Sequence, residues 1–274
     1  MTKRVVSPLR AVKEVTGAKD RSIAIQRLVA SIRTLAKDRG YRVGVTESPY
    51  EPRVYARMLG AVDIAEDADM LVAGAIVFHG TDPVIHLNPK SGSRVQQRFT
   101  LAHEVAHLAI WYTQKQIDPS YRPRRARGKR TDQLCHEIAA ELLVPQDELR
   151  QEWQDLSAKV GIRGRKLQII EQVARQYDVS LQMAAVRFRE ICAPSTGIGM
   201  LQGETCRFLW SIGIRSHAEL ATKFVNGLAT ARESESAAES YGFLTYCLNR
   251  EGLHIIPFSW HRLHGSHYLV VEEG

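Results

Sequence analysis

The sequence predicts an α+β protein, and three observations support that fold class. Several segments repeat apolar residues at helical spacing. Two β-rich segments, 71–79 and 84–88, flank a turn that contains glycine and proline, which is typical of a hairpin in a small antiparallel sheet. The C-terminal region combines helical spacing at 217–229 with strand-like segments at 253–260 and 267–271, which indicates a small α/β unit.

The composition is that of a folded protein and excludes several other classes. The chain has 274 residues, enough for a substantial core in one large or two modest domains. Hydrophobic residues make up 44% and charged residues 24%, which is ordinary for a globular protein. The four cysteines include no C-x-x-C pair, so neither a disulfide framework nor a cysteine metal site is indicated.

No segment is apolar enough to predict a signal peptide or a membrane helix. Residues 1–10 include basic residues but no long apolar run. The longest uncharged stretches, 70–81 and 191–203, fall short of the roughly 20 residues that a membrane-spanning helix needs. These observations predict a cytoplasmic protein.

Much of the formal net charge of +7 is local. Six of the nine residues in 122–130 are arginine or lysine. A run of this kind is more often a solvated loop than a binding site. A weak nucleic-acid contact through the basic segment 122–130 is the second interpretation.

Upstream of the hairpin the sequence predicts two helices and one strand. Residues 22–37 have apolar residues at helical spacing, with Ser22 as N-cap. Residues 41–46 alternate as a strand does, and residues 51–59 form a short helix. Residues 1–21 show no clear period and are expected to be loosely ordered.

The strongest chemical signal is the sequence H-E-x-x-H at residues 103–107. On a helix, His103 and His107 are four residues apart and project from one face, where two imidazoles can bind one metal ion. Glu104 beside them can take a proton from water that the metal makes acidic. The flanking residues are apolar on nearly every side, so the helix should be deeply buried. Burying three ionisable groups without a metal or partner would be costly.

A catalytic zinc site needs a third protein ligand, and the helix predicted at 131–144 offers four candidates. The candidates are Asp132, His136, Glu137 and Glu141. Asp132 and His136 are four residues apart and share a face, so one could bind the metal while the other hydrogen-bonds a ligand. Spacing alone leaves the choice open.

Two motif blocks together resemble the ImmA/IrrE family of metallopeptidases. Residues 98–107 read R-F-T-L-A-H-E-V-A-H and match the family pattern R-F-T-L-A-H-E-x-x-H throughout. Residues 132–145 resemble the second block, E-x-x-(A or C)-N-x-F-A-A-x-L-L-M-P. The resemblance extends from about residue 41 to about residue 190, and it implies a zincin-like metallopeptidase core.

The resemblance implies a role for each site residue. His103, His107 and Asp132 would bind Zn²⁺, and Glu104 would act as general base. Aspartate is one methylene shorter than the family's glutamate, so either the second helix lies closer to the metal or His136 is the third ligand instead. The implied substrate is a helix-turn-helix repressor, cleaved in a mobile-element or stress response. An extended peptide could pair along the edge of the hairpin. The hairpin could equally be an ordinary internal one with no part in peptide binding.

The remaining segments predict the domain organisation. Residues 164–190 are expected to form two amphipathic helices joined by a short turn, similar to a helix-turn-helix, within a metallopeptidase domain of residues 1–190. Packing of this pair on the catalytic domain is favoured over DNA reading, because the second helix has few base-reading polar residues near its start. A linker is expected at 191–203 and a small C-terminal α/β domain of unknown role at 204–274.

A function from another class is the alternative. The chain would then be a non-catalytic regulatory module that binds DNA or protein, with structural zinc or no zinc. It would use the helical pair and the basic segment 122–130.

Overall fold

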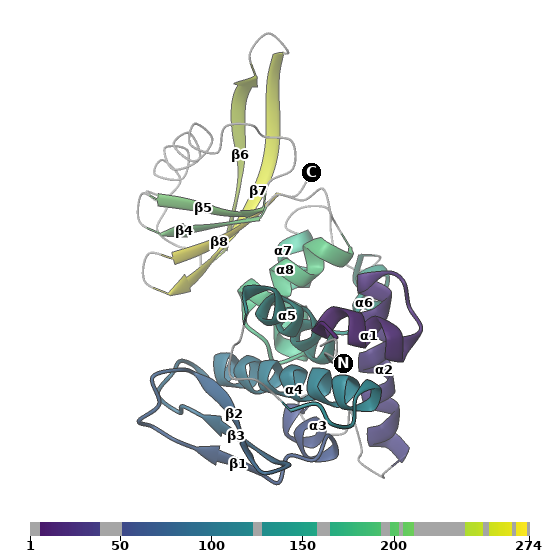
Figure 1. Ribbon diagram of the computed structural model, residues 1–274. Coiled ribbons are helices and arrows are strands. Elements are labelled where there is room, and N and C mark those ends of the chain that lie inside the picture. The colour runs from purple at the N-terminus through teal and green to yellow at the C-terminus, as the bar shows by residue number, and fades with distance from the viewer. Residues whose placement is uncertain are drawn as a thin grey trace. The chain divides into compact units, whose positions relative to one another are not determined.

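The computed structural model describes most of the chain (Figure 1). The described residues are 6–38, 51–122, 128–157, 165–192, 198–202, 205–210, 239–248, 252–264 and 267–272. The chain divides into two compact units, one of Met1–Gln146 with Gln176–Val179 and one of Asp147–Arg175 with Ser180–Gly274. The fold is α+β, as the sequence predicts.

The first unit is built around one long helix, α4. Its elements are α1 (Pro8–Thr16), α2 (Arg21–Asp38), α3 (Pro52–Met58), β1 (Asp63–Glu66), β2 (Gly74–His79), β3 (Asp82–Leu87), α4 (Arg94–Ile117) and α5 (Lys129–Leu143). The small sheet packs on one side of α4, and helices α1 and α5 pack on the other (Figure 1). Apolar side chains of α4 and α5 that are at most 3% exposed form the core between these helices: Leu101, Val105, Leu108, Leu134, Ile138 and Leu142.

The small sheet is mixed rather than antiparallel throughout. The strand order is β1-β3-β2, with β2 antiparallel to β3, so the predicted hairpin is confirmed. Strand β1 runs parallel to β3 and was not predicted, because its four residues, DIAE, show no strong apolar alternation. The hairpin turn is tighter than expected: His79 pairs with Asp82, and Gly80 takes the left-handed conformation at φ 68° that such turns require.

The predicted helices upstream of the sheet are confirmed, with two corrections at the N-terminus. Residues expected to be loosely ordered contain α1, which begins at Pro8 and is followed by Gly17 in the left-handed conformation. Helix α2 is not capped by Ser22. The carboxylate of Asp20 accepts a hydrogen bond from the backbone N–H of Ile23 at 3.0 Å, which also lowers the pKa of Asp20. The strand predicted at 41–46 lies outside the described residues.

Arg98 is a buried cation that ties the start of α4 to the segment Gln176–Val179. Its side chain is 8% exposed, and Nη1 donates hydrogen bonds to the carbonyl oxygens of Tyr177 at 2.6 Å and Asp178 at 2.9 Å. Burial lowers the pKa of Arg98, although the charge of Asp178 acts in the opposite direction. Replacement by methionine would leave both carbonyls without this donor.

We expect Arg98→Met to lower the free energy of unfolding by about 2 kcal/mol, because charge-assisted hydrogen bonds are lost from a buried site. Urea denaturation followed by circular dichroism measures this. Arg94→Met is the matched control on the same helix face: its side chain is 75% exposed, and its ion pair with Asp178 should contribute less than about 0.5 kcal/mol. Equal losses for the two variants would contradict the role given to Arg98.

The second unit joins three helices to an antiparallel sheet. Its elements are α6 (Gln146–Ser157), which starts one residue before the unit, α7 (Arg165–Gln176), α8 (Leu181–Ile191), β4 (Ile198–Gln202), β5 (Thr205–Trp210), β6 (Glu239–Leu248), β7 (Gly252–His264) and β8 (His267–Glu272). The rings of Trp153 and Phe188 meet at 4.9 Å and pack α6 against α8. The side chain of Ser180 caps α8 by accepting a hydrogen bond from the N–H of Met183 at 3.2 Å.

The sheet of the second unit differs in part from expectation. Its strand order is β5-β4-β8-β7-β6, and all neighbours are antiparallel. Strand β4 occupies residues 198–202, inside the segment 191–203 predicted as a linker. The two strands predicted near the C-terminus are confirmed as β7 and β8, and the helix predicted at 217–229 lies outside the described residues. Among described residues, none of the helices has the length and apolar character to cross a membrane.

Candidate metal centre

Helix α4 presents the two motif histidines from one face. The ring centroids of His103 and His107 lie 4.8 Å apart in an edge-to-face arrangement, as expected for positions one turn apart. The other residues of α4 between 101 and 110 are buried, and Ala102, Val105 and Ala106 are fully shielded from solvent. The buried helix therefore fixes where both imidazoles point.

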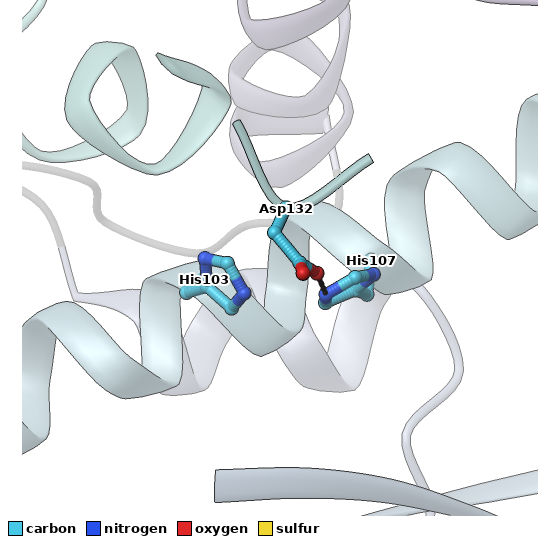
Figure 2. A group of neighbouring side chains, drawn as sticks. All are labelled: His103, His107 and Asp132. Carbon is cyan, nitrogen blue, oxygen red and sulfur yellow. Dashed lines mark ion pairs between the residues drawn. The ribbon is translucent and has the colours of Figure 1, made fainter. Parts of the chain in front are cut away.

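Asp132, near the start of α5, completes a cluster with these histidines (Figure 2). Its Oδ1 lies 3.6 Å from Nε2 of His107. One ligand atom from each of His103, His107 and Asp132 lies within 4.8 Å of the other two. Packing of α5 on α4 creates this cluster from residues that lie far apart in the sequence.

The cluster fits a bound divalent metal ion. Two imidazoles and a carboxylate are a donor set that zinc accepts in hydrolytic enzymes. Ligand atoms of a tetrahedral zinc site lie about 3.3 Å from one another, close to the separation of His107 and Asp132. Oδ1 of Asp132 is also buried and accepts no hydrogen bond from the described residues. A metal ion would satisfy this oxygen.

Glu104 lies beside the cluster without being part of it. Its side chain is only 2% exposed and faces the start of β2, where it lies next to Gly74. The helix places it directly after His103. A carboxylate in this position is suited to proton transfer rather than to metal binding.

The other three candidates for a third ligand have different surroundings. His136 is exposed and lies outside the cluster, although its ring centroid is 4.6 Å from that of His103. Glu137 accepts a two-pronged ion pair from Arg21, at 2.7 and 2.9 Å. Glu141 accepts a hydrogen bond from the backbone N–H of Gln146 at 3.1 Å. The surroundings of these residues favour Asp132 as the third ligand. Its helix, α5, lies close enough to α4 for the short aspartate side chain to reach the two histidines.

Two residues near the centre were not predicted from the sequence. Arg21 forms an ion pair with Glu137 of α5, which is 116 residues away in the sequence. No local sequence pattern predicts a pair of this kind. Gly74 touches the motif helix from β2, and only its place at the start of a β-rich segment before H-E-x-x-H could have indicated it. Most of the basic segment, residues 123–127, lies outside the described residues, so its nucleic-acid contact stays a prediction.

Comparison with known proteins agrees with the motif resemblance. Residues 63–189 match the family model of the IrrE N-terminal-like domain, Peptidase_M78. No curated protein was found that matches the chain. A solved structure of a Mycobacterium tuberculosis transcriptional regulator is 14% identical, with a TM-score of 0.53, and the match covers 96% of this chain and 93% of that one. At that identity the likeness concerns the fold alone.

The matched segment contains every residue of the metal cluster. It runs from β1 through both motif blocks into α8, where it ends at residue 189, and includes Glu104 and most of the helical pair. Both the family model and the two motif blocks indicate the same family. Residues 63–189 of this chain are thus a metallopeptidase-like domain of the ImmA/IrrE family.

Proposed function

We propose that this chain is a zinc-dependent endopeptidase. The observation that carries the proposal is the cluster of His103, His107 and Asp132 beside the buried carboxylate of Glu104. A metal site with three protein ligands leaves a position open for catalysis, whereas structural zinc sites usually have four. The domain's membership of a metallopeptidase-like family supports the same conclusion.

In this proposal three residues bind the metal and a fourth transfers protons. His103, His107 and Asp132 would hold the zinc, which when bound supplies Lewis acidity for water activation and carbonyl polarisation. Glu104 takes the proton from the attacking water and passes it to the leaving amine as the peptide bond breaks. Its burial on the same helix as both histidines supports this role.

The substrate we propose is a helix-turn-helix repressor, cleaved in a mobile-element or stress response. The ImmA/IrrE resemblance supports this choice, and the fold that the chain shares with a transcriptional regulator is compatible with it. Strand β2 ends the sheet order and adjoins Glu104 through Gly74, so an extended substrate segment could pair along it.

The proposed activity can be tested without knowing the substrate. Zinc-loaded protein is incubated with an extract of the source cells, and newly formed peptide N-termini are identified by mass spectrometry. We expect a small set of new N-termini that a His103→Ala/His107→Ala variant does not produce. The same set from both proteins would contradict the proposal.

Zinc should also stabilise the folded protein. With free zinc at 100 times the dissociation constant, we expect the free energy of unfolding to rise by about 2.7 kcal/mol. Urea denaturation with and without zinc measures the increase, and the His103→Ala/His107→Ala variant should lose it. An equal increase in both proteins would place the metal elsewhere.

DNA binding is the second candidate function. It is favoured by α7 and α8, two helices joined by the short turn 177–180, as in helix-turn-helix proteins. The first three residues of α8, Leu181, Gln182 and Met183, are at least partly exposed but offer little for base reading. Salt-dependent binding to duplex DNA, lost when the basic segment 122–130 is neutralised, would support this function.

A further inference from the structure

At the start of β2 the backbone is held in place by the end of β3 and by Asn88. Gly74, its first residue, is buried and pairs with Leu87 of β3. Just upstream, the carbonyl of Ala73 accepts a hydrogen bond from the N–H of Asn88 at 2.9 Å. The side-chain Nδ2 of Asn88 donates to the carbonyl of Met70 at 2.7 Å. These hydrogen bonds fix the start of β2 and the segment before it to β3 and Asn88.

At Gly74 the strand lies so close to α4 that a side chain has no room. A Cβ atom there would lie 2.6 Å from Cγ2 of Thr100, and 3.2 and 3.3 Å from Cγ and Oε1 of Glu104. The first distance is one that real Cβ atoms do not show, and the other two are also shorter than ordinary van der Waals contact. Thr100 and Glu104 are four residues apart on α4 and share the face that meets the strand.

The glycine is needed for space and not for backbone conformation. Its φ is not among the positive values found at Gly17, Gly60, Gly80 and Gly92. Alanine could therefore adopt the same backbone angles without strain. Any effect of Gly74→Ala must come from the added methyl group and the atoms it displaces.

We propose that Gly74 is a positioning residue for Glu104. The proposal rests on the proposed function, because it assigns the start of β2 a part in holding the general base. Without a side chain at position 74, the strand packs directly on the Glu104 side chain and confines its carboxylate beside the metal cluster. An added methyl group moves that carboxylate by a few tenths of an ångström or more, and proton transfer is sensitive to displacements of this size.

Cobalt(II) and acetohydroxamate provide a test with a spectroscopic readout. Cobalt(II) replaces zinc and has a visible absorption band, and acetohydroxamate binds such sites while giving up its hydroxyl proton to a nearby carboxylate. We expect Gly74→Ala to bind cobalt(II) within about threefold of the wild type, because no metal ligand is touched. Its affinity for acetohydroxamate should fall about 10-fold, because Glu104 is displaced.

Two double variants separate positioning from a general structural effect. Thr100→Ser removes the methyl group nearest to the new Cβ but leaves both tight contacts to Glu104, so Gly74→Ala/Thr100→Ser should still bind acetohydroxamate more weakly than Thr100→Ser alone. In a Glu104→Gln background, Gly74→Ala should have no further effect on acetohydroxamate binding, because the group through which it acts is already gone. Gly128→Ala is the matched control, since a Cβ at that glycine would meet nothing within 4 Å.

The outcomes distinguish this proposal from the proposed function. An unchanged acetohydroxamate affinity in Gly74→Ala overturns the positioning role. That role is also overturned if Gly74→Ala lowers the affinity as much in the Glu104→Gln background as in the wild type. Wild type that takes up no cobalt(II) overturns the proposed function itself, and the positioning role with it. If Gly74→Ala alone does not fold, the comparison is made with Gly74→Ala/Thr100→Ser, which keeps both tight contacts to Glu104.

Discussion

Glu104→Gln should lower the rate of peptide cleavage by about 1,000-fold while leaving the metal content unchanged. Glutamine has nearly the same shape as glutamate, so the packing around this 2% exposed side chain is kept. Its amide cannot take a proton from water at neutral pH, so only the proton-transfer step is lost. Cleavage of a substrate identified from the new N-termini, together with elemental analysis, measures both quantities.

Glu66→Gln is the control for this substitution. Glu66 is exposed at the end of β1, outside the cluster and separated from Gly74 by strand β3, so its replacement should leave the cleavage rate within about twofold of the wild type. A Glu104→Gln protein that contains metal and keeps more than a tenth of the activity would contradict a role for Glu104 as general base.

Asp132→Ala should weaken zinc binding by more than about 100-fold, since loss of an outer-shell partner alone costs 10 to 100-fold and a direct ligand costs more. His136→Ala should change the zinc affinity by less than about 10-fold, because this exposed ring lies outside the cluster, although it contacts the ring of His103. Competition with a chromophoric chelator measures both affinities.

The two variants together identify the third ligand. Their thermal unfolding without metal serves as the control, because each should fold as the wild type does when only a metal ligand or an exposed ring is removed. The reverse order of affinities, with His136→Ala the weaker binder, would show that the side chain of His136 turns into the site and replaces Asp132.

The metal-binding face of α4 could be predicted because its geometry is local. A helix fixes the relation between His103 and His107 whatever surrounds it, and the apolar flanks of the motif indicate burial. The third ligand depends on how α5 packs against α4, which the spacing within one helix does not encode. Sequence spacing therefore left several candidates, and the packing of the two helices favours Asp132.

The elements that were missed are short or depend on distant partners. Helix α1 has nine residues, of which only Ala11 and Val12 are buried, so its apolar period is weak. Pro8 at its start and Gly17 after its end are typical helix boundary residues, but they do not by themselves identify a helix without a longer apolar repeat between them. Strand β1 exists because β3 pairs with it, and a four-residue strand has too few positions for alternation to be recognised.

Metal content tests the central claim most directly. Wild-type protein purified without added metal is analysed by inductively coupled plasma mass spectrometry beside the His103→Ala/His107→Ala variant. We expect about one zinc ion per wild-type chain and almost none in the variant. Wild type that contains no zinc and takes up none on titration would contradict the assignment of His103, His107 and Asp132 as a catalytic metal centre.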